Sequence, residues 1–342
     1  MSISFEVLPH AARLAVLEEV ALAALSQYDI GGTPRVRLLN LSENATYSVE
    51  GGNRRYALRV HRDGYHSAAA SASELSWAVA LRDAGVAITP RPVWTRQGNC
   101  IAEVGHPALA RPRAVVLFDW ETGAEPDIAD DLTQPFERLG AVTARMHRHA
   151  RAWARPAGFI RPVWNFDTAL GDAAPHWGRW RDGMGVTPAH AALFARTVAA
   201  IGTRLARFGS GPDKFGLVHC DLRLANLLID GPTVKVIDFD DCGFSWVLYD
   251  AATPVSFYEH DPKVPDLIDA WVRGYRREAP LSDADAAEIP TFVMLRRLLL
   301  VAWIGSHSET DLAQSMGVAY THGTTGLCET YLTLFESRSG AR

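Results

Sequence analysis

Apolar and polar residues alternate through residues 35–61, and the alternation is interrupted by the turn sequence Gly51, Gly52 and Asn53. A period of two is typical of strands with one buried face, and a glycine-rich turn between two such runs favours a hairpin. Shorter runs rich in β-branched and aromatic residues follow, separated by Gly, Pro and Asn. We therefore expect an antiparallel sheet, extended by strands at residues 90–95, 99–104 and 114–120.

Helical periodicity, with apolar residues three or four positions apart, surrounds this sheet region. One helix is expected within residues 1–30. A second is expected within residues 66–85, where Ser67 can cap the start and Gly85 marks the end. Beyond residue 123 the pattern becomes mostly helical. The long helices predicted there span residues 136–153, 189–208, 263–278 and 286–304.

The order of these elements, sheet first and helices afterwards, predicts an α+β protein with two lobes. A β-rich N-terminal lobe would span residues 1–118, and a mostly helical C-terminal lobe would span residues 119–342. The chain has 342 residues, of which 48% are hydrophobic, and this is ample for two cores.

Charge and cysteine content narrow the class of protein. The formal net charge is -5 and no block of Lys and Arg stands out, which disfavours nucleic acid as a partner. The four cysteines are widely spaced, so we expect reduced thiols and no structural zinc. Glu18 and Glu19 interrupt the first apolar stretch, which therefore does not read as a signal peptide. Since no charge-free apolar run reaches the ~18 residues of a membrane span, we predict a soluble cytoplasmic protein with no membrane partner.

Polar residues are concentrated at the ends of three short apolar strands, which are predicted at residues 216–219, 226–230 and 234–239. Polar groups in such surroundings cost stability unless they pair with each other or with a ligand. Phosphoryl transfer from ATP needs a carboxylate near the acceptor hydroxyl, oxygen ligands for Mg²⁺ and cations near the phosphates. Asp221 suits the acceptor proton, and Arg223 suits the transferred phosphate. Asn226 and Asp238 offer the hard oxygen ligands that Mg²⁺ prefers.

The spacing H-x-D-x-x-x-x-N at His219, Asp221 and Asn226, followed by I-D-F-D at residues 237–240, resembles a known family. This is the aminoglycoside phosphotransferase and choline kinase-like branch of the protein-kinase-like fold, which includes type II homoserine kinases and to which bacterial stress-response kinases are similar. The resemblance implies a bilobal kinase-like fold, with ATP and Mg²⁺ as cofactors. It also implies Asp221 as the catalytic base and Asn226 and Asp238 as metal ligands.

Further residues near this motif acquire roles from the same resemblance. His219 would shape the catalytic loop, and Asp250 would support the loop from the start of a helix. Cys220 stands where the family usually has glycine, which removes backbone freedom but leaves the catalytic side chains in place, so we expect activity to survive. The Cys220 thiol is either redox-sensitive or buried and inert, and we favour the second interpretation.

In the N-terminal lobe, the family places a basic strand residue against the α- and β-phosphates, paired with a helical glutamate. Arg59 and Glu74 occupy these positions here. Arginine in place of the usual lysine changes the phosphate geometry, because the guanidinium is larger and forks its hydrogen bonds. The alternative is an edge-strand arginine in a surface ion pair.

The resemblance also implies two other parts of a nucleotide site. The turn of residues 41–46 would cover the phosphates with backbone N–H groups and the side chains of Ser42 and Asn44. This turn lacks the glycines of protein kinases and also fits an ordinary turn. Residues 117–120 resemble the hinge that binds adenine, with Phe118 and Trp120 beside the base, although these aromatics fit core packing equally well.

Histidines and tryptophans elsewhere are weaker candidates. His147 and His149 are two positions apart on a predicted helix and so face different directions, which favours packing over a metal site. The tryptophans of residues 151–183 either cover the substrate side or pack an irregular insert.

The segment from Asp238 to Asp250 is short and no A-P-E sequence follows, so the long activation segment of protein kinases is missing. This favours a small-molecule acceptor. Acidic residues in this region suit an amino-bearing alcohol, although ordinary solvated faces carry such charges too. They are Asp240 and Asp241, which are the candidate substrate contacts, together with Glu259 and Asp261.

We therefore predict an ATP- and Mg²⁺-dependent phosphotransferase that acts on a hydroxyl of a small molecule. The acceptor could be an amino alcohol or be homoserine-like, sugar-like or aminoglycoside-like. One alternative is a protein serine/threonine kinase of the stress-response type, which residues 236–257 and 295–304 resemble. The other is a nucleotide-binding pseudokinase that serves as an interaction module, for which Arg59 and Cys220 are the relevant departures.

Overall fold

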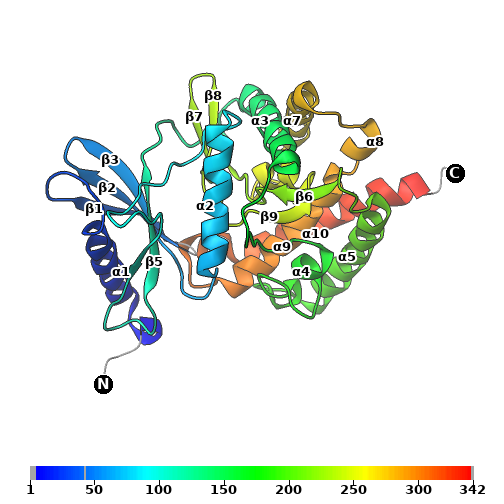
Figure 1. The fold of residues 1–342 in the computed structure, drawn as a ribbon. Coiled ribbons are helices and arrows are strands. Elements are labelled where there is room, and N and C mark those ends of the chain that lie inside the picture. The colour runs from blue at the N-terminus through cyan, green and yellow to red at the C-terminus, as the bar shows by residue number, and fades with distance from the viewer. Residues whose placement is uncertain (1–4, 42–43, 340–342) are drawn as a thin grey trace. The chain divides into compact units, whose positions relative to one another are not determined.

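The computed structural model describes residues 5–41 and 44–339, with side chains described as far as residue 335. The chain forms two compact units, which we call the N-terminal and the C-terminal unit (Figure 1). The sheet lies in the first and most helices lie in the second, which confirms the α+β class. The N-terminal unit takes its described residues from Met1–Gly85, Thr89–Thr122 and Arg155–Ile160, and the C-terminal unit from Val86–Ile88, Gly123–Ala154 and Arg161–Arg342.

Two short segments therefore belong to a unit other than that of their neighbours in the sequence. In the C-terminal unit, the carbonyl of Ile88 accepts a hydrogen bond of 3.0 Å from the backbone N–H of Val236. In the N-terminal unit, the backbone N–H of Ile160 donates to the Ser73 hydroxyl at 3.0 Å. Backbone groups need partners when they are buried, and these bonds supply them.

The N-terminal unit contains a five-stranded antiparallel sheet with strand order β1-β2-β3-β5-β4, as the alternating pattern predicts. The turn at Gly52, which has a positive φ of 57°, joins β2 to β3 in the expected hairpin. The strands are β1 (Arg35–Leu41), β2 (Ala45–Gly51), β3 (Arg54–Val60), β4 (Ala102–Val104) and β5 (Arg113–Asp119).

The strand expected at residues 90–95 does not form. Pro92 makes only an isolated bridge to Phe118. Proline has no N–H with which to continue a ladder, so the apolar and aromatic composition of this stretch is not sufficient for a strand. The neighbouring Val93 still donates its N–H to the Leu117 carbonyl at 2.7 Å, which keeps the segment beside β5.

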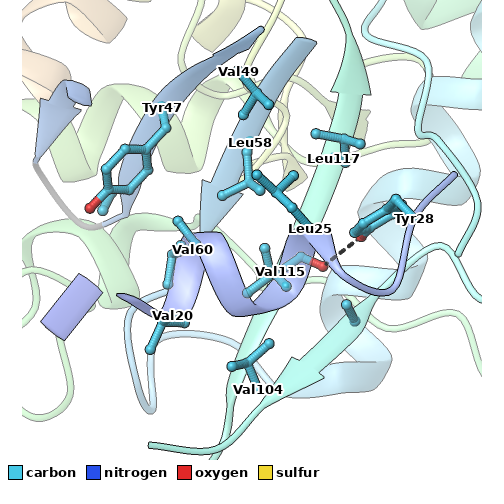
Figure 2. Close-up of a cluster of buried hydrophobic side chains, with 14 of the residues drawn as sticks. Val20, Leu25, Tyr28, Tyr47, Val49, Leu58, Val60, Val104, Val115 and Leu117 are labelled. Atoms are coloured by element: carbon cyan, nitrogen blue, oxygen red, sulfur yellow. Dashed lines mark hydrogen bonds between the residues drawn. The ribbon is translucent and has the colours of Figure 1, made fainter. Parts of the chain in front are cut away.

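The main core of this unit lies between the sheet and α1 (His10–Leu25), which carries Val20 and Leu25 into it (Figure 2). Strand residues such as Leu58 and Leu117 point into the same cluster (Figure 2). Tyr28 follows the helix and is fully buried, and its hydroxyl donates to the Val115 carbonyl at 3.4 Å. The short 3₁₀ helix η1 (Phe5–Val7) precedes α1.

A second cluster joins the sheet to α2 (Ala68–Asp83). Leu75 of α2 packs there with Val116 and Phe118 of β5. Ser67 accepts a hydrogen bond from the N–H of Ala70 at 3.2 Å, so it caps the helix as its sequence position predicts. Alternate residues of β5 therefore serve opposite faces of the sheet.

The C-terminal unit is mainly helical (Figure 1). Helices α3 and α7 pack closely, because Gly140 and Gly274 face the partner's backbone without side chains. The α-helices are α3 (Thr133–Ala152), α4 (Phe166–Leu170), α5 (Pro188–Phe208), α6 (Tyr249–Ala252), α7 (Val264–Glu278), α8 (Asp283–Ala286), α9 (Ile289–Ser306) and α10 (Asp311–Ser339). The short 3₁₀ helices are η2 (Trp180–Asp182), η3 (Leu224–Asn226) and η4 (Thr253–Val255).

Helix α9 is the core helix of the C-terminal unit. It belongs to the one described segment, Asp283–Ser306, that is long and apolar enough to cross a membrane. Most of that segment is buried within the protein, and α9 packs against α5, α6 and α10. Apolar composition along the whole helix is expected of a helix that is buried on every side.

Two short antiparallel strand pairs carry the segment of residues 219–241. One pair consists of β6 (Phe215–Val218) and β9 (Gly243–Trp246), and the other of β7 (Leu227–Asp230) and β8 (Thr233–Val236). The catalytic-loop candidate lies between β6 and β7, and the I-D-F-D sequence follows β8.

Candidate active site

A buried carboxylate and a neighbouring hydroxyl hold the loop that follows β6. Asp250, at the start of α6, is 0% exposed and accepts hydrogen bonds from the backbone N–H groups of His219 at 3.0 Å and Cys220 at 2.7 Å. The Thr253 hydroxyl accepts from the next free N–H along the loop, that of Leu222, at 2.9 Å. Asp250 thus makes the contact that the family resemblance implies for it.

His219 connects this loop to the I-D-F-D segment. Its Nδ1 accepts from the N–H of Asp221 at 3.3 Å, and its Nε2 donates to the carbonyl of Ile237 at 3.2 Å. The ring also packs against Phe239, with centroids 4.5 Å apart. Burial lowers the pKa of His219 despite the nearby charges of Asp250 and Asp221, so the ring is neutral and its two nitrogens have fixed roles.

Cys220 adopts a left-handed backbone conformation with φ of 68°. Glycine adopts this conformation without strain, which is consistent with the glycine that the family resemblance implies here. The side chain is 1% exposed, and burial raises the pKa of its thiol well above the ordinary value. These features agree with an inert buried thiol, because thiolate is the reactive form.

Asp221 is surrounded by donors. Asn226 donates from Nδ2 to Asp221 Oδ2 at 2.7 Å, and Arg223 Nε lies 3.4 Å from the same oxygen. The other oxygen, Oδ1, accepts from Arg296 of α9. Burial alone would raise the pKa of the Asp221 carboxyl, but the positive charges of Arg296 and Arg223 outweigh it and hold the pKa below its usual value. Asp221 is therefore an ionised carboxylate with both oxygens oriented.

Asn226 and Asp238 are positioned by the β7–β8 hairpin. The carbonyl of Asn226 accepts from the N–H of Ile237 at 2.9 Å, which extends the pairing by one residue and places Asp238 directly after it. Asp238 has a left-handed φ of 60° and an exposed side chain. Because Nδ2 of Asn226 is directed to Asp221, its Oδ1 is turned the other way. An amide oxygen and a solvent-facing carboxylate fit a divalent cation of the Mg²⁺ type.

The residues after Asp238 are held from the insert that precedes α4. Arg161, which is buried, donates Nε to the Cys242 carbonyl at 2.6 Å and also contacts the Asp240 carbonyl. Trp164 donates Nε1 to the carbonyl of Asp241 at 3.0 Å. Three consecutive carbonyls are thus fixed by two side chains. The Asp240 side chain is buried and that of Asp241 is partly exposed, so Asp241 is the better placed for a substrate.

The remaining predicted residues lie in the N-terminal unit. Arg59 of β3 is buried, and its Nη2 donates to both oxygens of Glu74 on α2, at 2.7 and 2.8 Å. This is a buried pair, so the alternative of a surface ion pair is wrong. The Arg59 guanidinium also lies 5.5 Å from the ring centroid of Phe118.

The candidate nucleotide contacts among the aromatic residues and in the turn of residues 41–46 differ in how far they are buried. Phe118 is buried in the cluster of Leu75, as core packing predicts. Trp120 is partly exposed, and Arg55 lies over its ring at 3.5 Å. Asn44 is buried, and its Oδ1 accepts from the N–H of Arg62 at 3.0 Å, which connects Asn44 to the residues that follow β3. Ser42 lies outside the described residues.

Sequence reasoning missed Arg296 and misjudged Glu259. Arg296 and Arg297 are adjacent inside an otherwise apolar helix. The signal available in the sequence was this pair of charged residues within an apolar run, because such charges need partners when the helix is buried. Glu259 does not add acidic charge to a substrate region, because it is buried and pairs with Arg297 at 2.7 Å and with the Tyr320 hydroxyl at 2.9 Å.

His147 and the tryptophan-rich insert are packing features. Among the residues that the structure describes, no group of three or more His, Cys, Asp or Glu side chains could hold a metal. His147 is buried and bonds to Asp250. Trp164 and Trp177 are buried in a T-shaped contact with centroids 5.0 Å apart. Trp177 also lies 5.2 Å from the Arg296 guanidinium, which brings the insert to the environment of Asp221.

This chain is similar to a known protein family and to solved structures of kinases. The model of the family described as "Phosphotransferase enzyme family" matches residues 36–286. That span contains the H-x-D-x-x-x-x-N and I-D-F-D motifs. The solved structure of the microcompartment-associated aminopropanol kinase is 45% identical in sequence, with a TM-score of 0.85, and the match covers 92% of this chain and 98% of that chain.

Amicoumacin kinases are also similar. The structure of amicoumacin kinase hAmiN in complex with AMP-PNP, Ca²⁺ and Ami has a TM-score of 0.75 and 21% identity, over 94% of this chain and 96% of that chain. The amicoumacin kinase of Bacillus subtilis (strain 168) is 24% identical over 310 residues, which cover 86% of each chain. These likenesses extend along nearly the whole chain and include both units.

Proposed function

The chain belongs to the phosphotransferase enzyme family, and on this basis we propose that it transfers the γ-phosphate of ATP to the hydroxyl of a short amino alcohol of the aminopropanol type. The observation that carries the proposal is the 45% identity, over 98% of that chain, to a protein described as an aminopropanol kinase. Fold alone would support only the class of reaction, since one fold serves many acceptors.

Asp221 is the residue that would contact the acceptor hydroxyl. Its pKa is held low, so it is a weak base. This suits phosphoryl transfer through a loose transition state, in which positioning and electrostatic stabilisation contribute more than early proton removal. Asp221 would orient the hydroxyl toward the phosphorus and receive its proton late. Arg223, which is partly exposed beside Asp221, would stabilise charge on the transferred phosphoryl group.

Asn226 Oδ1 and the Asp238 carboxylate would hold a divalent cation, which when bound neutralises phosphate charge and aligns the phosphates. The donor set supports this use, since both groups offer hard oxygens and are joined by the hairpin pairing of Asn226 with Ile237. We infer Mg²⁺ as the ion. A neighbouring structure that contains AMP-PNP and Ca²⁺ supports a nucleotide with a divalent metal.

The N-terminal unit would supply the nucleotide contacts. Arg59, held by Glu74, would bind the α- and β-phosphates with its guanidinium. Asn44, whose side chain is bound to the N–H of Arg62, and the hydroxyl of Ser42 would contribute polar groups near the phosphates. Phe118 and Trp120 would lie near adenine.

The substrate ammonium would be recognised by Asp241. Its side chain is partly exposed, and its charge acts on the Arg296 guanidinium beside Asp221. An amino alcohol of two or three carbons needs its cation close to the reacting hydroxyl, and a carboxylate near the base meets this need. Asp240, being buried, would support the loop.

The fixed segment after Asp238 favours a small acceptor over a protein. Arg161 and Trp164 bind its carbonyls at residues 240–242, whereas protein kinases use a longer segment here to bind a peptide. This supports a small-molecule acceptor over the protein acceptor of the stress-response-kinase alternative.

Coupled ADP release with ATP and Mg²⁺ tests the proposal against a panel of aminopropanol, ethanolamine, choline, homoserine and an aminoglycoside. We expect the largest kcat/KM with aminopropanol and loss of stimulated turnover in Asp221→Asn and Asp238→Ala. Preference for homoserine or for the aminoglycoside would contradict the acceptor class. Stimulation that persists in Asp221→Asn would contradict the assignment of the base.

A further inference from the structure

Arg296 is buried in the centre of the C-terminal unit and is bound at several points. It is 2% exposed and contacts Oδ1 of Asp221. Its Nε donates to the Ser256 hydroxyl at 3.1 Å, and its Nη1 donates to the Tyr249 hydroxyl at 3.3 Å. The guanidinium fork is therefore fixed by two groups that do not take part in the proposed chemistry, and it presents its remaining Nη2 to the base.

The two carboxylate oxygens of Asp221 are bound by residues of two different elements. Arg296 of α9 binds Oδ1, and Asn226 of the catalytic loop binds Oδ2 at 2.7 Å. A carboxylate held at both oxygens from different directions cannot rotate about its χ2 angle without breaking one of these bonds. Its remaining lone pairs then have fixed directions, which is what an acceptor hydroxyl requires.

Stability alone is a poor reason for an arginine at this position. Removing an arginine from water is costly, and apolar residues of similar size often serve a core equally well. The neighbouring Arg297 shows what a packing arginine does in the same helix. It is equally buried, and its partners are Glu259 and two groups of α10, the Thr324 hydroxyl and the Tyr320 carbonyl, so it joins α9 to α10.

We propose that Arg296 is a positioning residue that fixes the orientation of the Asp221 carboxylate for the acceptor hydroxyl. The inference rests on the proposed function, because it takes Asp221 as the residue that contacts the acceptor. Arg296 acts through Asp221, because its hydrogen-bond partners are protein groups of the C-terminal unit, namely Asp221, Ser256 and Tyr249. Trp177, whose ring centroid is 5.2 Å from the guanidinium, packs beside the fork from the insert.

The test compares Arg296→Ala and Arg296→Lys with Arg297→Lys, a matched change at the adjacent buried arginine. Steady-state kinetics with ATP, Mg²⁺ and aminopropanol are measured for each, together with thermal unfolding. A misplaced catalytic group costs roughly 100-fold, so we expect kcat of Arg296→Ala to fall by about that factor while the KM for ATP stays within a few-fold. Arg296→Lys should retain more activity, since lysine keeps the positive charge and one hydrogen bond to Asp221. Arg297→Lys should lower the unfolding temperature but keep kcat.

Chemical rescue separates positioning from folding. Guanidinium chloride at non-denaturing concentration should restore part of the kcat of Arg296→Ala, and sodium chloride at equal ionic strength should not. Unchanged kcat in Arg296→Ala, an equal loss in Arg297→Lys, or a loss that follows only the unfolded fraction would each overturn the inference. If Arg296→Ala does not fold, a wild-type kcat in Arg296→Lys overturns it and a reduced kcat supports it.

Asp221→Asn, measured in parallel, distinguishes the two claims. An inactive Asp221→Asn beside a fully active Arg296→Ala refutes only the role of Arg296. An active Asp221→Asn refutes the proposed base, and with it the role of Arg296 as well.

Discussion

His147 of α3 donates its Nε2 to Oδ2 of Asp250 at 3.0 Å, and both side chains are almost completely buried. The Nδ1 of the same ring lies 3.1 Å from the Tyr275 hydroxyl of α7. The carboxylate that binds the N–H groups of the catalytic loop is therefore itself held by a second helix. The loop geometry depends on the packing of α3 and α7 as well as on its own sequence.

Replacement of His147 by leucine tests this dependence. It leaves a buried Asp250 oxygen with one bond fewer, which costs about 1–3 kcal/mol in the free energy of unfolding. We also expect a lower kcat, because the loop that carries Asp221 loses support. Urea unfolding and steady-state kinetics measure the two effects. His149→Leu is the control, since His149 is only partly buried and burial lowers the pKa of its ring, and it should change stability little. Equal effects of the two substitutions would contradict the role given to His147.

The contact between α3 and α7 gives a second prediction. A Cβ at Gly274 would lie 1.7 Å from the Glu137 carbonyl oxygen, which belongs to the backbone and cannot move without displacing α3. Gly274→Ala should therefore destabilise the protein by about 3 kcal/mol or more. Gly326→Ala in α10 is the matched change, because no atom beyond its own turns of helix lies within 4 Å of its Cβ position. It should stabilise the helix by up to about 1 kcal/mol. Thermal unfolding of both variants would show opposite signs, and a stable Gly274→Ala would refute the close approach of the helices.

The left-handed conformation of Cys220 gives a third prediction. Substitution by glycine or by alanine removes the same sulfur, but only glycine adopts φ of 68° without strain. Cys220→Gly should therefore be more stable than Cys220→Ala by about 1 kcal/mol. Activity should persist in Cys220→Gly, because no catalytic side chain changes. Chemical denaturation of the pair gives the difference, and greater stability of the alanine variant would show that the strain is not present.

The buried pair of Arg59 and Glu74 gives a fourth prediction. Arg59→Met leaves the Glu74 carboxylate without this partner and removes the cation proposed for the phosphates. We expect the KM for ATP to rise by roughly tenfold or more, which corresponds to about 1.4 kcal/mol, with a smaller change in the KM for aminopropanol. Arg59→Lys should recover part of the ATP affinity, because it restores the charge but not the fork. An unchanged KM for ATP in Arg59→Met would remove Arg59 from the nucleotide site.

Local sequence patterns were sufficient to predict the elements whose signals are local. The alternation of residues 35–61, the Ser67 cap and the long helical periods all lie within single elements, and the structure contains them. The motif from His219 to Asp241 was equally accessible, because its spacing fixes a loop followed by a hairpin. Residues 90–95 failed as a strand because the effect of Pro92 on hydrogen bonding outweighs local composition.

Contacts between distant parts of the chain could not be predicted in this way. Arg296 is 75 residues from Asp221, and His147 is 103 residues from Asp250. Periodicity indicates which face of a helix is buried but not which polar group it meets there. The two arginines of α9 therefore appeared as anomalies in an apolar helix, and only the packed structure assigns one to Asp221 and the other to Glu259.

The central claim is that this chain moves a phosphoryl group to the hydroxyl of aminopropanol through Asp221. The most direct test follows the reaction of ATP, Mg²⁺ and aminopropanol by ³¹P NMR, with wild type and Asp221→Asn. We predict a new phosphomonoester resonance that grows in step with ADP in the wild type and is lost in Asp221→Asn. ADP formation with free phosphate but no phosphomonoester, or the same ester in both proteins, would contradict the account.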